Sequence, residues 1–315
     1  MFNHIPVLLN ETIDGLNVNK DGIYVDATLG GGGHSEKILK TLKTGKGYLI
    51  GIDQDEDAIK FTSERLKDYI NDKKLFIEKN NFENVDEVLD KYSIDKIDGI
   101  LFDLGVSSYQ FDEGDRGFSY NHDAVLDMRM DKSSALTCKT LVNTFSEEEI
   151  FHIIRDFGED NFAKNIAKHI VAERKKKEIE TTFELVDIIK SAIPAKLRWG
   201  EGNEKNPAKR TFQAFRVYIN RELEVVNIVL DKVIDRVNVG GRICVITFNS
   251  IEDKLVKDKF KTFENPCTCP RNLPCVCGKK SKGFIVNKKV ITATDIELNE
   301  NRRSKPAKLR IFERG

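Results

Sequence analysis

The sequence has 315 residues, of which 40% are hydrophobic and 32% are charged, and its 51 Lys and Arg balance its 51 Asp and Glu. This composition is typical of a globular protein with an ample core, and the lack of any run of about 18 apolar residues predicts no membrane span. The first residues lack the basic-then-apolar pattern of a secretory signal, so we expect a cytoplasmic protein.

Positive charge gathers locally although the chain is neutral. Between Arg271 and Gly315, twelve Lys or Arg oppose four Asp or Glu, and a second basic stretch runs from Ala163 to Lys177. Such surfaces are compatible with binding to nucleic acid. Solvated helix faces are an equally good interpretation of either stretch.

Strands and helices are predicted to alternate through the first 103 residues. Apolar runs predict strands over residues 23–26, 46–53, 75–77 and 97–103. Helical patterns begin at residue 34 and cover residues 56–70 and 84–92. This alternation predicts a parallel, doubly wound α/β sheet with a ligand crevice at the carboxyl ends of its strands.

Four consecutive glycines, residues 30–33, follow the first strand and open the first helix. Glycines adopt positive φ and let backbone N–H groups approach a ligand closely. The dinucleotide pattern G-x-G-x-x-G fails here, because its last position falls on Ser35 or Glu36. Asp26 before the loop would repel a pyrophosphate and favours a cationic or zwitterionic ligand such as S-adenosylmethionine. A structural turn without a ligand is the alternative.

A second acid, Asp53, ends the next strand about 20 residues beyond the glycines, where carboxylates bind ribose hydroxyls in nucleotide-binding units. Such an acid is often only the N-cap of the following helix, a role that Asp55 can also fill. Together, the glycine loop and Asp53 favour a nucleoside-containing ligand. Phe82 and Asp103 fall at the ends of the third and fourth strands, which directs four elements to one crevice.

The alternation stops between about residues 111 and 210, where helices are predicted over 146–157, 161–177 and 182–192. A loop is predicted at 198–210. The α/β pattern then resumes with a helix at 221–237, a strand at 242–248, a helix at 251–263 and a strand at 307–312. We therefore expect an α/β core with an all-helical insertion after its fourth strand, placed to shape substrate access.

Six cysteines include a cluster formed by Cys267, Cys269, Cys275 and Cys277. Disulfides are not expected in a cytoplasmic chain. The cluster suits either a tetrahedral metal site or a reduced surface loop, and its C-x-C spacing is tighter than the usual zinc spacing. We favour the reduced loop and predict no metal ligands.

The motifs together resemble a known family. The run from Asp26 to Ser35, DATLGGGGHS, is similar to the cofactor loop of the bacterial small-subunit ribosomal RNA methyltransferase H (MraW) family. Further similar motifs are FDLGVSSYQ at 102–110, RGFS at 116–119, LDMRMD at 126–131, RTFQA at 210–214, SIED at 250–253 and KLR at 308–310. They occur in family order and span essentially the whole chain.

The resemblance implies a class I, Rossmann-like methyltransferase core at 1–110 and 211–315, with RNA substrate recognition by the helical insertion at 111–210. It implies an S-adenosylmethionine-dependent enzyme that methylates the exocyclic N4 of a cytidine in the decoding region of small-subunit (16S) ribosomal RNA. The implied partner is that RNA or the 30S subunit, with a homodimer left open and no membrane. The implied cofactor contacts are Gly32, Gly33, His34, Asp53, Phe82, Asp103 and Gln110.

Cytosine N4 is a poor nucleophile because its lone pair is delocalised, so an enzyme must position it and accept its amino protons. We hypothesise that Asp103 or the Leu104 carbonyl is the acceptor, with Tyr109 or Phe118 stacking on an extruded base. Cofactor contact alone is an equal alternative for Asp103. For His34, capping or packing is an equal alternative to a cofactor role.

RNA phosphates are expected to meet Lys205, Lys209 and Arg210, and Arg116 is a weaker candidate because nearby acids can pair with it. The family commonly has His where this chain has Asn249, which puts a proton role at that position in doubt. That substitution faintly favours a second hypothesis, a non-catalytic RNA-binding assembly factor that retains the cofactor fold. A methyltransferase acting on DNA or a small molecule is a weaker third reading.

Overall fold

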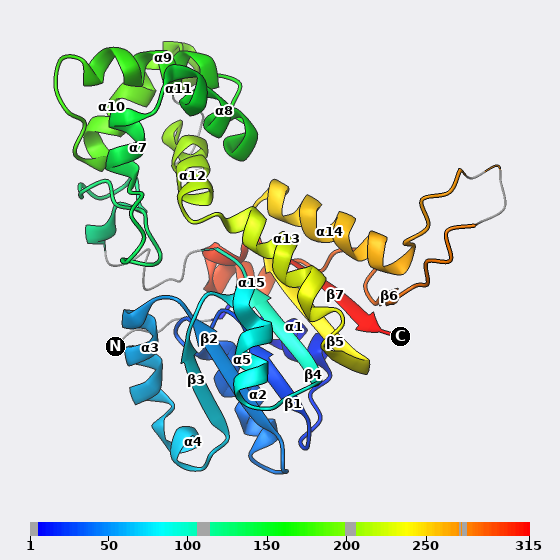
Figure 1. The fold of residues 1–315 in the computed structure, drawn as a ribbon. Coiled ribbons are helices and arrows are strands. Elements are labelled where there is room, and N and C mark those ends of the chain that lie inside the picture. Colours follow the sequence, from blue (N-terminus) through cyan, green and yellow to red (C-terminus); the bar gives the residue numbers. More distant parts are fainter. Residues whose placement is uncertain (1–5, 106–113, 199–205, 271, 273–275) are drawn as a thin grey trace. The chain divides into compact units, whose positions relative to one another are not determined.

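The structure, a computed structural model, describes residues 6–105, 114–198, 206–270, 272 and 276–315 (Figure 1). The chain forms two compact units. The first, which we call the core unit, combines Met1–Gly105 with Leu223–Gly315, and the second, the helical unit, is Val106–Glu222. The helical unit thus begins and ends at 106 and 222 instead of the predicted 111 and 210.

The core unit is built on a sheet whose seven described strands have the order β3-β2-β1-β4-β5-β7-β6. Strands β1 to β5 pair in parallel, β7 pairs antiparallel with β5, and β6 pairs antiparallel with β7. This confirms the predicted doubly wound, mainly parallel, Rossmann-like α/β fold. The strands are β1 Ile23–Asp26, β2 Tyr48–Asp53, β3 Leu75–Lys79, β4 Ile97–Asp103, β5 Val237–Thr247, β6 Gly283–Ile285 and β7 Lys308–Arg314.

Helices cover both faces of the sheet because neighbouring strand residues point to opposite sides. Val25 and Ile100 pack with α5 and α13, whereas Tyr24 and Leu101 pack with α2 on the other face. The helices of the core unit are α1 Leu9–Leu16, α2 Gly33–Leu42, α3 Glu56–Arg65, α4 Lys67–Asn71, η1 Phe82–Asn84, α5 Val85–Lys91, α13 Glu222–Val233, α14 Ser250–Glu264, α15 Asp295–Glu300 and η4 Arg302–Ser304.

The helical unit has a hydrophobic core of its own. Aliphatic side chains of α8, α9 and α10, together with Phe212 and Phe215 of α12, fill it. The predicted capping box at the start of α8 is present, with Ser146 and Glu149 bonded reciprocally. The helices are η2 Gly114–Arg116, α7 Cys138–Thr144, α8 Glu147–Gly158, α9 Ala163–Arg174, α10 Thr182–Ala192, α11 Ala195–Arg198 and α12 Ala208–Ile219.

Helix α12 explains why the unit ends later than predicted. It packs against α8, where Gly158 lies so close to Arg210 that a Cβ atom would meet its carbonyl oxygen at 2.7 Å. The segment 211–222 therefore belongs to the helical unit rather than to the resuming α/β pattern. Within the residues described, we find no helix with the length and apolar character needed to cross a bilayer.

Candidate active site

Three acidic side chains and one aromatic ring lie at the carboxyl edge of the sheet. Asp26, Asp53 and Asp103 end β1, β2 and β4, and Phe82 follows β3. Since β3, β2, β1 and β4 are consecutive neighbours with parallel pairing, their carboxyl ends share one edge. The structure therefore brings together, at one edge of the sheet, the residues that the sequence assigns to the ligand crevice.

The glycine run connects β1 to α2, and its members serve different purposes. Gly32 has φ +73°, and a Cβ there would lie 2.6 Å from Thr62 Cγ2. A Cβ on Gly33 would lie 2.2 Å from Pro6 Cγ. Around Gly31 the nearest atom would be 4.0 Å away, on Phe61. Close packing thus requires glycine at 32 and 33, while the backbone at 31 has open space beside it.

Asp26 is 1% exposed and lies beneath this loop. Its carboxylate accepts hydrogen bonds from the Ser35 hydroxyl at 2.6 Å and from the Thr28 N–H at 3.2 Å. Burial raises the pKa of Asp26 to about 6, and the two hydrogen bonds oppose that rise. The acid therefore ties β1 to α2 from below the loop.

Asp53 holds the glycine loop against β2. Its two oxygens accept from the Gly30 N–H at 2.8 Å and the Asp55 N–H at 2.9 Å, and burial raises its pKa to about 6. Asp55, not Asp53, is the N-cap of α3, because its side chain accepts from the Asp57 N–H. Each Asp53 oxygen keeps a lone pair for a further donor.

Phe82 begins the short helix η1 directly after β3. Its ring packs edge-on against Phe102 of β4, with the centroids 5.7 Å apart. Asn81 fixes this turn, because its side chain accepts from the Glu83 N–H and donates to the Gln54 side chain after β2. An aromatic ring is thereby held at the same edge as the acids.

Asp103 is the most perturbed acid of the crevice. Its N–H donates to the Thr28 hydroxyl at 2.6 Å, while its Oδ1 is buried without a hydrogen-bond partner among the residues that the structure describes. Burial, followed by repulsion from Asp26, raises the pKa of Asp103 to about 8. A buried acceptor without a donor is a feature of ligand sites.

His34 connects Asp103 to the N-terminal segment. The side chain is 5% exposed, with Nε2 lying 3.0 Å from the Val7 carbonyl oxygen and Nδ1 lying 3.6 Å from Asp103 Oδ2. A carbonyl only accepts, so Nε2 carries a hydrogen. The other ring nitrogen, Nδ1, faces the Asp103 carboxyl.

Two residues that the sequence suggested for RNA contact, Phe118 and Arg116, are buried within the helical unit instead. Phe118 is buried in the core of the helical unit, with the Arg116 guanidinium over its ring, so the prediction that Phe118 stacks on an extruded base is wrong. Arg116 is itself buried and donates to the carbonyl oxygens of Arg129 and Met130, which is a structural role and not phosphate binding. Tyr109 and Gln110, the other two candidates after β4, lie outside the described residues.

Residues near the end of β5 form contacts that single motifs did not reveal. Asn249 is the N-cap of α14, and its side chain accepts from the N–H groups of Ile251 and Glu252. Asp253 accepts from Arg310 Nε at 2.6 Å and from Lys308 Nζ at 3.2 Å, and both cations help to lower its pKa although burial acts to raise it. The motifs SIED and KLR, far apart in sequence, thus pair α14 with β7.

Comparisons with known proteins agree over the full length. A family model described as the MraW methylase family matches residues 1–315. Ribosomal RNA small subunit methyltransferase H of Lachnospira eligens is 60% identical over 314 residues, covering 99% of this chain and 98% of that protein. Ribosomal RNA small subunit methyltransferase H 2 of Agathobacter rectalis is 56% identical over 315 residues, with coverage of 99% and 98%. The chain therefore belongs to the MraW methylase family.

Proposed function

We propose that this protein transfers a methyl group from S-adenosylmethionine to the exocyclic N4 of a cytidine in the decoding region of small-subunit ribosomal RNA. The observation that carries the proposal is 60% identity over nearly the whole length to a protein named ribosomal RNA small subunit methyltransferase H. The choice of the N4 atom rests on the motif resemblance, and the crevice supplies the chemistry it needs.

The crevice fits S-adenosylmethionine in three respects. Asp53 retains lone pairs for the ribose hydroxyls, and Phe82 offers an aromatic face to the adenine. The buried, partnerless Oδ1 of Asp103 suits an ammonium or amine donor. When bound, S-adenosylmethionine supplies an electrophilic methyl group on a sulfonium centre.

Asp103 is suited to accept a proton from cytosine N4. A pKa raised to about 8 makes its carboxylate a stronger base than an ordinary aspartate, and it stays partly ionised near neutral pH. His34 Nδ1, 3.6 Å from Oδ2, lies within reach to share that proton after a small approach. A proton that passes from N4 to the Asp103 carboxylate neutralises that carboxylate, so the proton transfer adds no charge to the buried crevice.

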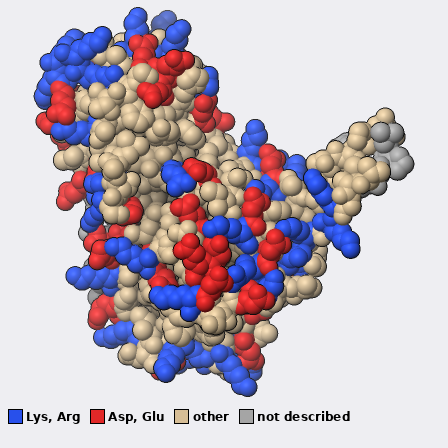
Figure 2. Space-filling view, viewed as in Figure 1, with Lys and Arg blue, Asp and Glu red and all other residues tan. Residues whose placement is uncertain are grey.

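The helical unit is proposed to recognise the RNA. It contains nineteen Lys or Arg and twenty Asp or Glu, so any attraction to phosphate must come from local basic surfaces and not from its net charge. In Figure 2 blue and red side chains are interspersed over most of the viewed face, while blue side chains gather around α9 and α10.

A homodimer of this chain stays a prediction, which sedimentation velocity would test.

We favour the hypothesis of a catalytic methyltransferase over that of a non-catalytic assembly factor. Asn249, the residue that faintly favoured the second hypothesis, has a structural role as the N-cap of α14. Its presence in place of His therefore does not indicate decay of the site. The glycine loop, Asp53 and Asp103 all keep their places in the crevice.

The experiment that tests the proposal is methyl transfer from labelled S-adenosylmethionine to 30S subunits, naked small-subunit RNA and duplex DNA, side by side. We expect label in the 30S subunits or their RNA and none in DNA. Label in DNA alone would contradict the proposal. Binding of both S-adenosylmethionine and RNA without any transfer would instead support the assembly factor.

A further inference from the structure

The segment 265–282, which we call the cysteine loop, is a long connection within the core unit. It connects α14 to β6, and its end is fixed by the Lys282 N–H, which donates to the Phe263 carbonyl oxygen at 2.8 Å. The Ile285 N–H donates to the Glu264 side chain at 3.0 Å. Figure 1 shows the described residues of this loop extending away from the ends of α14 and β6.

The described part of this loop has no secondary structure and no apolar core to hold it. No helix or strand is assigned to its described residues, and the side chain of Val276 is 87% exposed. Ordering such a segment costs roughly 1–2 kcal/mol of backbone entropy per residue. A loop of this kind needs a specific cross-link if it is to hold one conformation.

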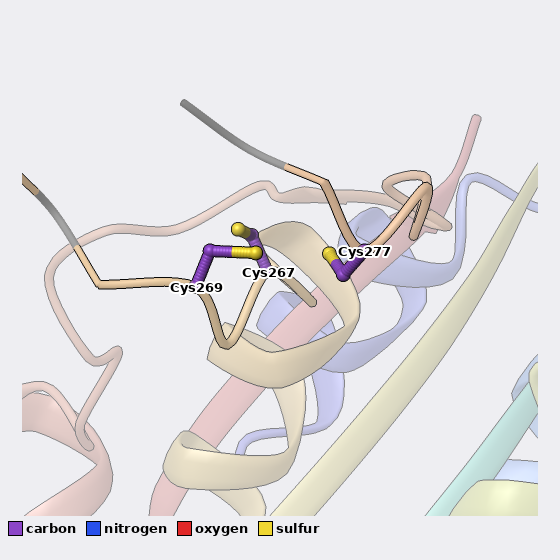
Figure 3. Close-up of side chains that lie close together, drawn as sticks. All are labelled: Cys267, Cys269 and Cys277. Atoms are coloured by element: carbon purple, nitrogen blue, oxygen red, sulfur yellow. The ribbon is translucent and has the colours of Figure 1, made fainter. Parts of the chain in front are cut away.

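Three thiols gather inside the loop. The sulfur atoms of Cys267, Cys269 and Cys277 all lie within 4.8 Å of one another, and Figure 3 shows the side chains of Cys269 and Cys277 turned toward each other with Cys267 beside them. A tetrahedral zinc ion with Zn–S bonds of about 2.3 Å holds its sulfurs about 3.8 Å apart. A disulfide needs about 2.05 Å and joins only two sulfurs. The gathering of three sulfurs matches a shared ion.

We propose that Cys267, Cys269 and Cys277 bind one structural zinc ion as thiolates. Zinc suits the set because thiolate ligands select zinc or iron–sulfur clusters, and a single ion fits three sulfurs at this spacing, with a water molecule in the fourth tetrahedral position. Binding displaces the three thiol protons to solvent and leaves one net negative charge on the zinc with three thiolates. Lys279 and Lys280, which follow the loop's last cysteine after one glycine, offset that charge.

The placement of the side chains reverses the sequence-based preference for a reduced loop without metal. The C-x-C spacing does not prevent convergence here, because the sulfurs of Cys267 and Cys269 lie within 4.8 Å of each other. Here Cys277 comes from the returning half of the loop and completes the set with Cys267 and Cys269. Cys275 lies outside the described residues, and the proposal does not require it.

The test is the metal content of the full-length protein. After incubation with zinc sulfate and a phosphine reductant, followed by desalting, elemental analysis should find about one zinc per chain. The variants Cys267→Ser, Cys269→Ser and Cys277→Ser should each fall to background, while Thr268→Ala in the same loop should keep the wild-type content. All these variants retain the buried Cys138 and Cys244, so those thiols cannot explain a difference.

Cobalt gives an independent spectroscopic readout. Cobalt(II)-loaded wild-type protein should show thiolate-to-cobalt charge transfer in the near ultraviolet and tetrahedral visible bands, both lost in Cys277→Ser. Zinc should also slow tryptic cleavage after Lys279 and Lys280, and a chelator should restore it. No zinc uptake by the reduced wild type, equal uptake by the serine variants, or the absorption of an iron–sulfur cluster would overturn the proposal. None of these readouts depends on methyl transfer.

Discussion

The three acids of the crevice differ in what their carboxylate oxygens contact. The carboxylate oxygens of Asp26 and Asp53 accept hydrogen bonds from backbone N–H groups of the glycine loop and its neighbours. Asp103 instead keeps Oδ1 without a partner among the described residues and places Oδ2 near the His34 ring. Asp26 and Asp53 therefore hold the glycine loop in place, whereas Asp103 is available to accept a proton.

The first prediction concerns the pH dependence of methyl transfer. Asp103 must be ionised to accept a proton, and its pKa in the free protein is raised to about 8, so kcat/KM should rise with pH and level off above about 8. The variant Asp103→Asn should lose that rise and roughly 100-fold or more in kcat. Steady-state rates between pH 6 and 9 provide the measurement.

Asp72→Asn is the matched control, because this exposed acid follows α4 and precedes the amino end of β3, at the opposite edge of the sheet from the crevice. It should keep the wild-type profile. Full turnover with unchanged cofactor affinity in Asp103→Asn would eliminate both the catalytic and the cofactor role.

The second prediction concerns stability. The folded-state pKa of Asp26, about 6, lies above its ordinary value of 3.8, so its contribution is present below about pH 4 and is lost as pH rises through 6. Relative to Asp26→Asn, which cannot ionise, the wild type should therefore lose on the order of 3 kcal/mol of unfolding free energy between pH 4 and 7.

Denaturant unfolding of the ligand-free proteins at several pH values measures this difference. Asp68→Asn, an exposed acid on α4, provides the baseline. A constant difference between wild type and Asp26→Asn across this range would mean that the Asp26 carboxyl is not desolvated.

At the scale of single elements, side-chain caps fix where the helices begin. The third prediction is that Asn249→Ala destabilises the protein by about 1 kcal/mol, because two N–H groups at the start of α14 lose their acceptor. Asn249→Asp, which keeps an accepting oxygen, should retain most of the stability. Urea unfolding compares the three proteins, and equal midpoints for Ala and wild type would refute the capping role.

Local signals made most of the core elements predictable. The strands at 23–26 and 97–103 occur as predicted, since continuous apolar runs bounded by acids or glycines leave little choice. The predicted helix at 56–70 is divided at Leu66 into α3 and α4. Short elements such as β6 and α15 were missed, because three to six residues carry too little periodicity.

The candidate site was predictable where a residue sits at a strand end, and not where tertiary packing decides. Asp53, Phe82 and Asp103 lie at the predicted edge because strand ends follow from the strand pattern. The burial of Phe118 and Arg116 depends on contacts within the helical unit that no local motif encodes. Likewise, the pairing of Asp253 with Arg310 joins elements 57 residues apart.

At the scale of the whole molecule, each unit has its own core, which suits a division between chemistry and substrate recognition. Within the predicted phosphate surface, Arg210 donates to the Glu159 carbonyl, whereas the Lys209 side chain is exposed. Lys205 lies outside the described residues. Lys209 is therefore the best described residue for testing RNA contact.

The fourth prediction is a steep fall of RNA affinity with salt, because bound phosphates release counterions. Lys209→Gln should weaken binding and reduce the slope of log affinity against log salt by about one. Lys67→Gln, an exposed lysine on α4 of the core unit, should leave the slope unchanged. Filter binding at several salt concentrations measures it, and a flat wild-type slope would exclude phosphate contacts.

The identity of the methylated atom tests the central claim most directly. Small-subunit RNA or 30S subunits methylated by the purified protein would be digested to nucleosides and analysed by mass spectrometry against synthetic standards. We predict N4-methylcytidine at a single site, strongly diminished with Asp103→Asn. Methyl groups on C5 of cytidine, on another base, or on ribose would contradict the assignment of Asp103 as the acceptor for an exocyclic amine.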